Sequence, residues 1–465
     1  MNQNTSKHIA TAIALSFTTI ASHAAVSLPA IFSDNMVIQQ NSEITIWGWA
    51  KPKEPVEITT TWSNDTLRTE AAADATWSLK IATPEATDEP QTLSIRGWSH
   101  IDIRNILIGE VILCSGQSNM EWTVGAGFIG VDSIKANSDR PNVRMFNVDY
   151  RTADTPNHDV SGSWKVASPE TIGSFSVIGY IIAARLSDEL GVPVGIINSS
   201  WGGTPIEVWT PGEAYEMCDY LRSVNDELSD NEWGPTRPAK AYNAMIAPLA
   251  GYKISCIAWY QGEANVENPR AYTDMMSSLV SGFREAFGAD IPFVYAQIAP
   301  YNYGSGKGVE IRERQRRAMF IPRTSMVVIG DLGDVDNIHP QHKIEAGNRF
   351  ANALLNEVYG KKEFKYAAPL FDKMEINGSK AIVTFKNADG LHCRGSKRPN
   401  LFEIAGADGV FYPAQATLQG NAVTLQASQV KVPVAVRFAW DDTAMPNLYN
   451  AAGIQASCFT TQDEF

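Results

Sequence analysis

The stretch Gly109-Glu-Val-Ile-Leu-Cys-Ser-Gly-Gln-Ser-Asn-Met-Glu-Trp122 combines a short apolar run, two small residues and a serine that follows them. The run from Val111 to Cys114 is suited to a buried strand, and the Ser-Gly pair after it permits a sharp turn. Open α/β sheets place their sites at the carboxyl ends of their strands, which is where Ser118 would lie. Ser118 is therefore a candidate nucleophile, although serine is also a preferred residue for capping a helix.

The region around this stretch, from Asn105 to about Gly360, alternates between strand-like and helix-like patterns. A helix-like segment from Ser176 to Leu190 ends at Gly191, which is suited to close a helix, and an apolar strand follows it. Later strands are expected at 254–259, 292–297 and 326–329, and later helices at 270–287, 309–320 and 341–359. Strands and helices that alternate with short links predict an α/β fold with a doubly wound parallel sheet.

Two regions that flank this core contain short β-rich segments instead. From about Val26 to Arg104, and again from about Tyr366 to Phe465, the segments are separated by turn-forming Pro, Asn, Asp and Gly. In the second region the pairs Asn377-Gly378 and Asp408-Gly409 favour tight reversals between antiparallel strands. We therefore predict an N-terminal β-sandwich-like domain over 25–104, the α/β domain over 105–364 and a C-terminal β domain over 365–465.

The first residues have the pattern of a secretory signal. Lys7 precedes an uncharged, largely apolar run from Ile9 to Ile20, and Ser22-His-Ala24 follows as a cleavage site. A signal peptide over 1–24 predicts export to the periplasm or the medium. The apolar run is too short to span a bilayer comfortably, and no other run reaches the roughly 20 apolar residues that a membrane helix needs. We expect no membrane insertion.

Charge and cysteine content narrow the class of partner. Acidic residues number 51 and basic residues 38, a net charge of −13 without a dense Lys/Arg cluster, which argues against a nucleic-acid partner. A neutral or weakly charged ligand fits better. The five cysteines show no Cys-x-x-Cys spacing, so neither a zinc knuckle nor a redox pair is indicated. Cys114 and Cys256 lie in apolar runs and are expected as core thiols, while a disulfide among the others stays open.

A nucleophilic serine needs a general base, almost always histidine, and a carboxylate that orients it. Among the seven histidines, His339 and His342 both follow the last predicted strand of the α/β core, and Asp336 precedes His339 by three residues. Asp336 and His339 would both lie on a loop at the sheet edge where Ser118 emerges. The alternative interpretation is that Asp336 and Asn337 form a polar turn and that His339 caps a helix.

Donors for a developing oxyanion are expected from two further stretches that end at the same edge. In Asn198-Ser-Ser-Trp-Gly-Gly-Thr-Pro-Ile-Glu-Val-Trp209, Gly203 and the glycine before it can bring a backbone N–H close to a ligand. In Trp259-Tyr-Gln-Gly-Glu-Ala-Asn265, the amides of Gln261 and Asn265 are candidate donors. Each stretch has a structural alternative, because Gly-Gly is common in turns and Gln or Asn can serve loop hydrogen bonds.

These ordered blocks together resemble a known family. Gly116-Gln-Ser-Asn-Met120, the two stretches quoted above and Asp336-Asn-Ile-His-Pro340 are similar to the sialate O-acetylesterase family, carbohydrate esterases within the SGNH hydrolases. Tyr242-Asn-Ala-Met-Ile-Ala-Pro-Leu249 and Asn447-Leu-Tyr-Asn450 also resemble family landmarks, so the likeness covers most of the chain. The resemblance implies an SGNH/flavodoxin-like sheet and deacetylation of a sugar through an acetyl-serine intermediate, without a metal or an organic cofactor.

Carried over residue by residue, the resemblance makes Ser118 the nucleophile, His339 the general base and then acid, and Asp336 the residue that orients His339. The backbone N–H groups of Ser118 and Gly203 would contribute to the oxyanion hole. The chain departs from the superfamily pattern Gly-x-Asn-Asp, because Ala264 stands where the oxyanion-binding asparagine is expected. Gln261 and Asn265 are both candidates for that side-chain donor. Glu263, which lies between them, is expected to brace the loop.

The expected substrate is an acetylated sugar or glycan. Sialate is the first expectation from the resemblance, and acetylxylan or another polysaccharide is the alternative with the same triad. A hypothesis from another class is a secreted carbohydrate-binding protein with an inactive α/β core. A missing Ser or His would favour that hypothesis, and neither is missing here.

Overall fold

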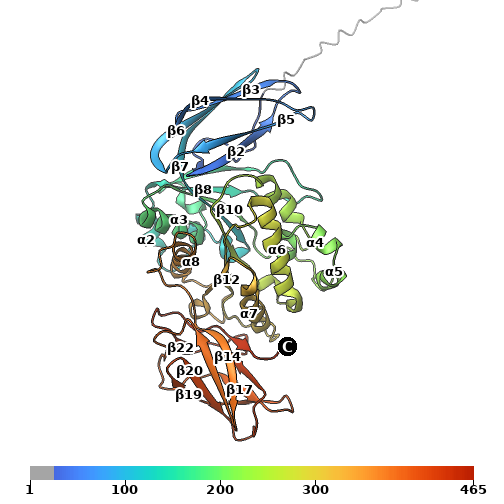
Figure 1. Cartoon of the computed structure of the whole chain (residues 1–465), viewed down its shortest axis with the longest axis vertical. Helices are drawn as coiled ribbons and strands as arrows, with labels where there is room; N and C mark the ends of the chain where they lie inside the picture. The colour runs from blue at the N-terminus through green and yellow to red at the C-terminus, as the bar shows by residue number, and fades with distance from the viewer. Residues whose placement is uncertain (1–25) are drawn as a thin grey trace, which may run out of the picture.

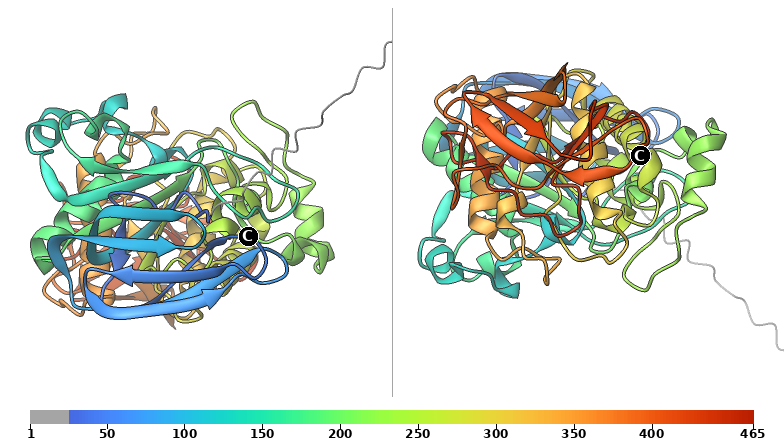
Figure 2. Two further views of the ribbon diagram at one scale, coloured as in Figure 1. Left: turned by 90° about the horizontal axis from the view of Figure 1, so that it is seen from above. Right: turned by 90° about the horizontal axis from the view of Figure 1, so that it is seen from below.

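The computed structural model describes residues 26–465, so the predicted signal peptide lies outside the described residues. Three parts follow one another along the long axis of the molecule: an N-terminal β region, an α/β core and a C-terminal β region (Figure 1). The segment with the short helices α4 (Glu213–Glu216) and α5 (Asp219–Asn225) projects from one side of the core (Figure 2). This is the predicted fold class, an α/β core flanked by antiparallel β regions.

The central sheet has the strand order β13 (Thr324–Val328), β12 (Phe293–Gln297), β11 (Cys256–Tyr260), β7 (His100–Gly116), β10 (Val194–Ser200), β8 (Arg140–Val148), β9 (Gly162–Ala167). All neighbours are parallel except β9, which is antiparallel to β8. In the middle of the sheet, Gly116 of β7 is level with Ser200 of β10 and Tyr260 of β11. Three carboxyl ends therefore meet at one edge, where ligands of open α/β sheets bind.

Helices cover both faces of this sheet (Figure 1). α3 (Val177–Leu190) packs against α8 (Lys343–Glu357) on one face, and α6 (Tyr272–Phe287) packs against α7 (Gly308–Arg317) on the other. The start of α3 is fixed because Oγ of Ser176 accepts a hydrogen bond from the Gly179 N–H, and its end because Gly191 has φ 69°. The predicted positions of these helices are confirmed to within a few residues.

The N-terminal region pairs β2 (Ser42–Trp49) with β5 (Thr76–Thr83) and places β3 (Pro55–Thr60) between β4 (Ser63–Glu70) and β6 (Thr87–Arg96). β6 is antiparallel to the first part of β7, and β1 (Val37–Gln39) runs parallel to a later part. β7 is thus one strand of both the N-terminal region and the core. The domain boundary after Arg104 stays a prediction, and β7 runs continuously through that position.

The C-terminal region has a core of its own. One sheet has the order β14 (Leu370–Asn377), β15 (Lys380–Lys386), β20 (Ala422–Gln426), β19 (Gln415–Gln419), and the other β18 (Phe411–Pro413), β17 (Phe402–Ala405), β21 (Ala435–Phe438), β23 (Phe459–Thr460). A short pair joins β16 (His392–Cys393) to β22 (Leu448–Tyr449). Phe402, Phe438 and Phe459 are packed together between the sheets. The predicted turn at Gly378 connects β14 to β15 with φ 61°.

Some elements had no clear signal in the sequence. β8 begins with Arg-Pro-Asn and mixes charged with apolar residues, so neither strand period is visible. β9 and α2 (Val131–Ala136) are similarly short and polar. All five cysteines are free thiols, with Cys114 and Cys256 fully buried as expected.

Candidate active site

The buried second half of β7 leads directly to Ser118. Every residue from Ile106 to Gly116 is buried, and φ of Gly116 is +136°. A Cβ at Gly116 would lie 2.1 Å from the carbonyl oxygen of Tyr260 on β11, so only glycine lets the two strands end this close together. The turn then starts the short helix α1 (Ser118–Glu121), and Ser118 is its first residue.

Ser118 is not a helix cap. The capping position of α1 is occupied by Gln117, and no side-chain capping bond is formed there. Oγ of Ser118 instead lies 3.0 Å from Nε2 of His339, which is 221 residues further along the chain. This distance is a good hydrogen bond for a hydroxyl and an imidazole. The structure therefore brings the predicted serine and histidine together.

His339 lies on the loop between β13 and α8 and is half-buried. The Trp122 ring, which follows α1, packs on the imidazole with centroids 4.6 Å apart and a 37° tilt. The Trp122 indole is itself held, since its Nε1 donates to the carbonyl oxygen of Gly127 at 2.9 Å. Burial, and then the positive charge of Lys343, lower the pKa of His339. Both effects favour the neutral imidazole that a general base requires.

A buried polar network lies behind Ser118. Nδ2 of Asn119 donates to Oε1 of Glu263 at 2.6 Å and to the carbonyl oxygen of Ile338 at 3.1 Å, and Oδ1 of Asn119 accepts from Nζ of Lys343. Lys343 is 1% exposed, and burial lowers its pKa to about 7. Burial likewise raises the pKa of Glu263. Asn119 thus connects the helix that carries Ser118 to the loop that carries His339.

The glycine pair lies beside Ser118 on the other side. The N–H of Gly202 donates to Oε2 of Glu121 at 2.6 Å, and a Cβ at Gly202 would lie 3.4 Å from Cβ of Ser118. Gly203 has φ +74°, which turns its backbone out of the extended conformation. Among the described residues, the N–H groups of Ser118 and Gly203 have no hydrogen-bond partner. Two backbone donors are therefore available near the serine.

No hydrogen bond or ion pair joins the Asp336 carboxylate to His339. Asp336 is exposed, and its carboxylate makes no hydrogen bond or ion pair within residues 26–465. The carboxylate that precedes it, Asp334, accepts a hydrogen bond from the Asp336 N–H at 3.0 Å. Oδ1 of Asn337 accepts from the main-chain N–H of His339 at 2.9 Å. The loop is thus ordered by its own Asp and Asn side chains, as the polar-turn alternative expected for Asn337.

The amides of Gln261 and Asn265 are hydrogen-bonded to other buried groups, whereas the sequence led us to expect that one of them donates to an oxyanion. Both are fully buried and neither lines the cavity at Ser118. Nε2 of Gln261 donates to the carbonyl oxygen of Thr204 and to Oδ1 of Asn265, at 3.2 and 2.8 Å. Nδ2 of Asn265 donates to the buried carboxylate of Glu207 at 2.8 Å. Their amides are occupied in holding the glycine-containing segment against the end of β11.

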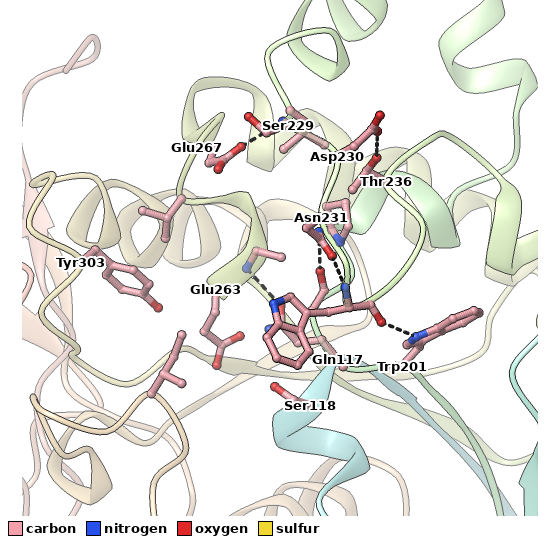
Figure 3. Close-up of a pocket in the computed structure, with 18 of the residues that line it drawn as sticks. Gln117, Ser118, Trp201, Ser229, Asp230, Asn231, Thr236, Glu263, Glu267 and Tyr303 are labelled. Carbon is pink, nitrogen blue, oxygen red and sulfur yellow. Dashed lines mark hydrogen bonds between the residues drawn. The ribbon is translucent and has the colours of Figure 1, made fainter.

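A cavity of about 1060 Å³ opens above Ser118. Its lining includes Ser118, His339 and both glycines of the pair. Glu263 and Tyr303 also line it, and Figure 3 shows them with Ser118. Trp201 and several residues between Glu227 and Thr236 complete the lining. This volume is at the upper end of the range for ligand pockets and is far larger than an acetyl group needs.

The comparisons with known proteins bear directly on this site. The family model described as carbohydrate esterase, sialic acid-specific acetylesterase, matches residues 109–356, more than half of the chain. The chain belongs to this family. A carbohydrate acetylesterase of solved structure from Xanthomonas citri is 30% identical with a TM-score of 0.86, and the match covers 94% of this chain and 100% of that chain.

Curated relatives agree with the family. Sialate O-acetylesterases from Homo sapiens and Rattus norvegicus are 27% and 28% identical over 453 and 497 residues. The matches cover 88% and 91% of this chain, and 86% and 91% of the two relatives. The resemblance stated from the sequence is thereby confirmed. The protein is a carboxylic ester hydrolase that acts on carbohydrate acetyl groups.

Several residues of the esterase site were missed in the sequence. Asn119 and Glu121 stand in the opening stretch, but their partners Glu263 and Gly202 lie 144 and 81 residues away. One signal pointed to Lys343. A lysine in the first turn of a helix interacts unfavourably with the helix dipole, so its presence there indicates that it has another role, such as a buried contact.

Clusters of metal-binding side chains and helices that could span a membrane are both absent from the described residues. Within residues 26–465, no group of three or more His, Cys, Asp or Glu side chains is arranged to hold a metal ion. None of the helices in that range combines the length and the apolar character needed to cross a bilayer.

Proposed function

We propose that the protein is a serine esterase that removes O-acetyl groups from a carbohydrate through an acetyl-serine intermediate. The observation that carries the proposal is the 3.0 Å contact between Oγ of Ser118 and Nε2 of His339, at the floor of a large cavity in a chain of this family. Ser118 is the nucleophile, and His339 is the general base and then the general acid.

The reaction has two halves. Oγ of Ser118 attacks the acetyl carbonyl carbon while Nε2 of His339 takes the hydroxyl proton, and the imidazolium then gives that proton to the sugar oxygen that leaves. A water molecule, deprotonated by His339, next attacks the acetyl-serine carbonyl; the bond to Oγ of Ser118 then breaks, acetate leaves, and the imidazolium returns the proton to Oγ. The lowered pKa of His339 supports the first step, because the imidazole is neutral at neutral pH.

The negative charge that develops on the carbonyl oxygen needs donors. The N–H groups of Ser118 and Gly203 are proposed for this role, since neither has a partner among the described residues. The Gly202 N–H is occupied by Glu121. Gln261 and Asn265, whose amides are engaged elsewhere, are proposed to hold the glycine segment in place rather than to donate directly.

Asp336 stays the proposed orienting carboxylate. It precedes His339 by three residues on the same loop, and its carboxylate is not engaged by any other described residue. Catalytic hydrogen bonds are often long or absent before substrate binds, so the separation in this state is compatible with the role.

The sugar has two candidates. The curated relatives are sialate O-acetylesterases, which supports a sialate substrate. The second candidate is a neutral acetylated polysaccharide such as acetylxylan, and the acidic lining of the cavity favours it. The signal-like residues 1–24 support export to the periplasm or the medium as the place of action.

The test uses a small acetate ester such as 4-nitrophenyl acetate, which needs no sugar contacts. Ser118→Ala and His339→Ala should each reduce kcat by about 10⁴-fold or more while the thermal unfolding profile is kept. Ser133→Ala and His342→Ala are matched controls, because both residues are exposed and lie outside the cavity. Trapping of an acetyl group on the Ser118 peptide by mass spectrometry would establish the intermediate. Retained turnover by Ser118→Ala would refute the assignment.

A further inference from the structure

We propose that the cavity above Ser118 is built to bind an uncharged acetylated glycan, with a sugar hydroxyl between Glu263 and Tyr303 and a sugar ring against Trp233. The substrate is then a neutral polysaccharide rather than a sialate. This inference rests on the proposed function, because it concerns the sugar whose acetyl group Ser118 accepts.

The charges of the cavity are the first support. The carboxylates of the lining come from Glu121, Glu227, Asp230, Glu263 and Glu267, and the described residues of the lining include one lysine and no arginine. Glu227 and Asp230 are balanced from outside the cavity by ion pairs with arginines. Glu121 and Glu267 form no ion pair with a basic side chain among the described residues. The Glu263 carboxylate, by contrast, is opposed by the charge of the buried Lys343, to which Asn119 connects it.

The single cation of the lining is poorly placed to change this balance. Nζ of Lys307 donates to the main-chain oxygen of Glu267 at 3.1 Å, and Glu267 itself adds a carboxylate to the lining. A sialate brings its own carboxylate, and proteins bind carboxylates best through the paired donors of arginine. With several carboxylates and no arginine in the lining, bringing in another negative charge is unfavourable, whereas an uncharged sugar is not penalised.

Two unpartnered polar atoms next to Ser118 are the second support. Oε2 of Glu263 and the hydroxyl of Tyr303 are both buried, and neither has a hydrogen-bond partner among the described residues. The Glu263 residue as a whole is only 7% exposed. Both residues line the cavity, and in Figure 3 the Glu263 carboxylate is directed toward Ser118 while the Tyr303 hydroxyl is directed toward the Glu263 side chain. Buried polar groups are rarely left unsatisfied, so such a pair indicates a ligand group. A carboxylate accepts and a phenol can donate, which together suit a sugar hydroxyl that does both.

Trp233 is the third support. Its side chain lines the cavity and is 70% exposed, which is unusual for so large an apolar surface. Its main chain is fixed at both ends, because its N–H donates to Oδ1 of Asn231 at 2.9 Å and its oxygen accepts from Nε1 of Trp201 at 2.9 Å. An exposed indole carried by this held main chain offers a flat apolar face to the C–H face of a sugar ring.

The experiment compares kcat/KM of the full-length enzyme on acetylated xylo-oligosaccharides, on 9-O-acetyl-N-acetylneuraminic acid and on 4-nitrophenyl acetate. The wild type should prefer the neutral oligosaccharide over the sialate by about tenfold or more. Tyr303→Phe removes only the hydroxyl, and Trp233→Ala removes the indole. Each should lower the ratio of oligosaccharide to nitrophenyl ester kcat/KM by about five- to tenfold.

Matched controls keep these ratios interpretable. Tyr301→Phe removes a phenol hydroxyl from the same loop but outside the lining, and Trp98→Ala removes an exposed indole in the N-terminal region. Both should leave all three rates unchanged. Faster turnover of the sialate, or ratios that Tyr303→Phe and Trp233→Ala do not change, would overturn the inference while Ser118-dependent ester hydrolysis persists. Loss of the proposed function would instead appear as nitrophenyl ester hydrolysis that does not depend on Ser118.

Discussion

The buried ammonium of Lys343 donates a hydrogen bond to Oδ1 of Asn119, the residue that follows Ser118. Asn119 also donates to the main-chain oxygen of Ile338, which precedes His339. One buried cation is therefore linked to both members of the Ser118–His339 pair, and its charge acts on the imidazole through a water-poor region. This arrangement makes the protonation of His339 dependent on a residue that never contacts it.

Lys343→Met should shift the pH dependence of the reaction. The charge of Lys343 lowers the pKa of His339, so its removal raises that pKa and protonates the base at a higher pH. The acid limb of kcat/KM for 4-nitrophenyl acetate should move to higher pH, because this parameter reports the free enzyme. Lys135→Met, at an exposed position on α2, is the control. An acid limb that stays in place or moves to lower pH would contradict the link.

Lys343 should also make the stability of the protein depend on pH, because burial lowers its pKa in the folded state. Its pKa is about 7 in the folded protein and roughly 10.4 in an unfolded chain, so between these values the unfolded state binds more protons. The free energy of unfolding contributed by Lys343 should therefore rise as the pH rises from about 7 to 10. Urea denaturation of the wild type and Lys343→Met at pH 7 and pH 9 measures this. An equal change of stability in both proteins would show that Lys343 is not the source.

Gly203→Ala should reduce activity beyond its effect on stability. The left-handed φ of +74° costs an alanine about 1–2 kcal/mol, and the added Cβ would lie 2.6 Å from Cβ of Trp233. Relief of that contact would move the Gly203 N–H, and loss of one oxyanion donor typically lowers kcat by about 10²-fold. Gly409→Ala is matched, since φ of Gly409 is +72° and nothing lies within 4 Å. It should show the conformational cost alone, measured by urea denaturation, with normal kcat.

Asp336→Asn tests whether catalysis uses the triad Ser118, His339 and Asp336 or only the pair Ser118 and His339. If Asp336 turns to the imidazole when substrate binds, the asparagine should lower kcat by as much as about 10⁴-fold with KM little changed, because tautomer control is lost. Asp132→Asn on α2 is the control at another exposed position. A decrease below about tenfold would show that the Trp122 contact suffices to position His339.

Much of the fold and the central pair could be predicted because the signals are local. The apolar run of β7 and the small residues after it lie within a few residues of Ser118, and α3 is marked by its own capping serine and closing glycine. His339 could be selected because few histidines exist and, of the two that follow the last core strand, it is the one that Asp336 precedes by three residues.

The directions of buried amides could not be predicted in this way. Gln261 and Asn265 stand at the strand end where a donor is expected, yet their partners are Thr204 and Glu207, more than fifty residues away. A buried carboxylate such as Glu207 must be satisfied by hydrogen bonds, and the asparagine amide supplies one. The conformation of the Asp336 loop likewise depends on local hydrogen bonds, which the side chains of Asp334 and Asn337 accept from main-chain N–H groups of the loop. These bonds favour a loop conformation in which the Asp336 carboxylate is not hydrogen-bonded to His339.

The continuity of β7 couples the unfolding of the N-terminal region to that of the α/β core. A chain that started at residue 105 would lose the antiparallel part of the strand, where β6 is paired, and keep the part that ends at Ser118. The N-terminal region therefore stabilises the first part of β7, the strand that leads to Ser118. Removing it should destabilise the central sheet, so the N-terminal region and the α/β core should unfold as one cooperative unit.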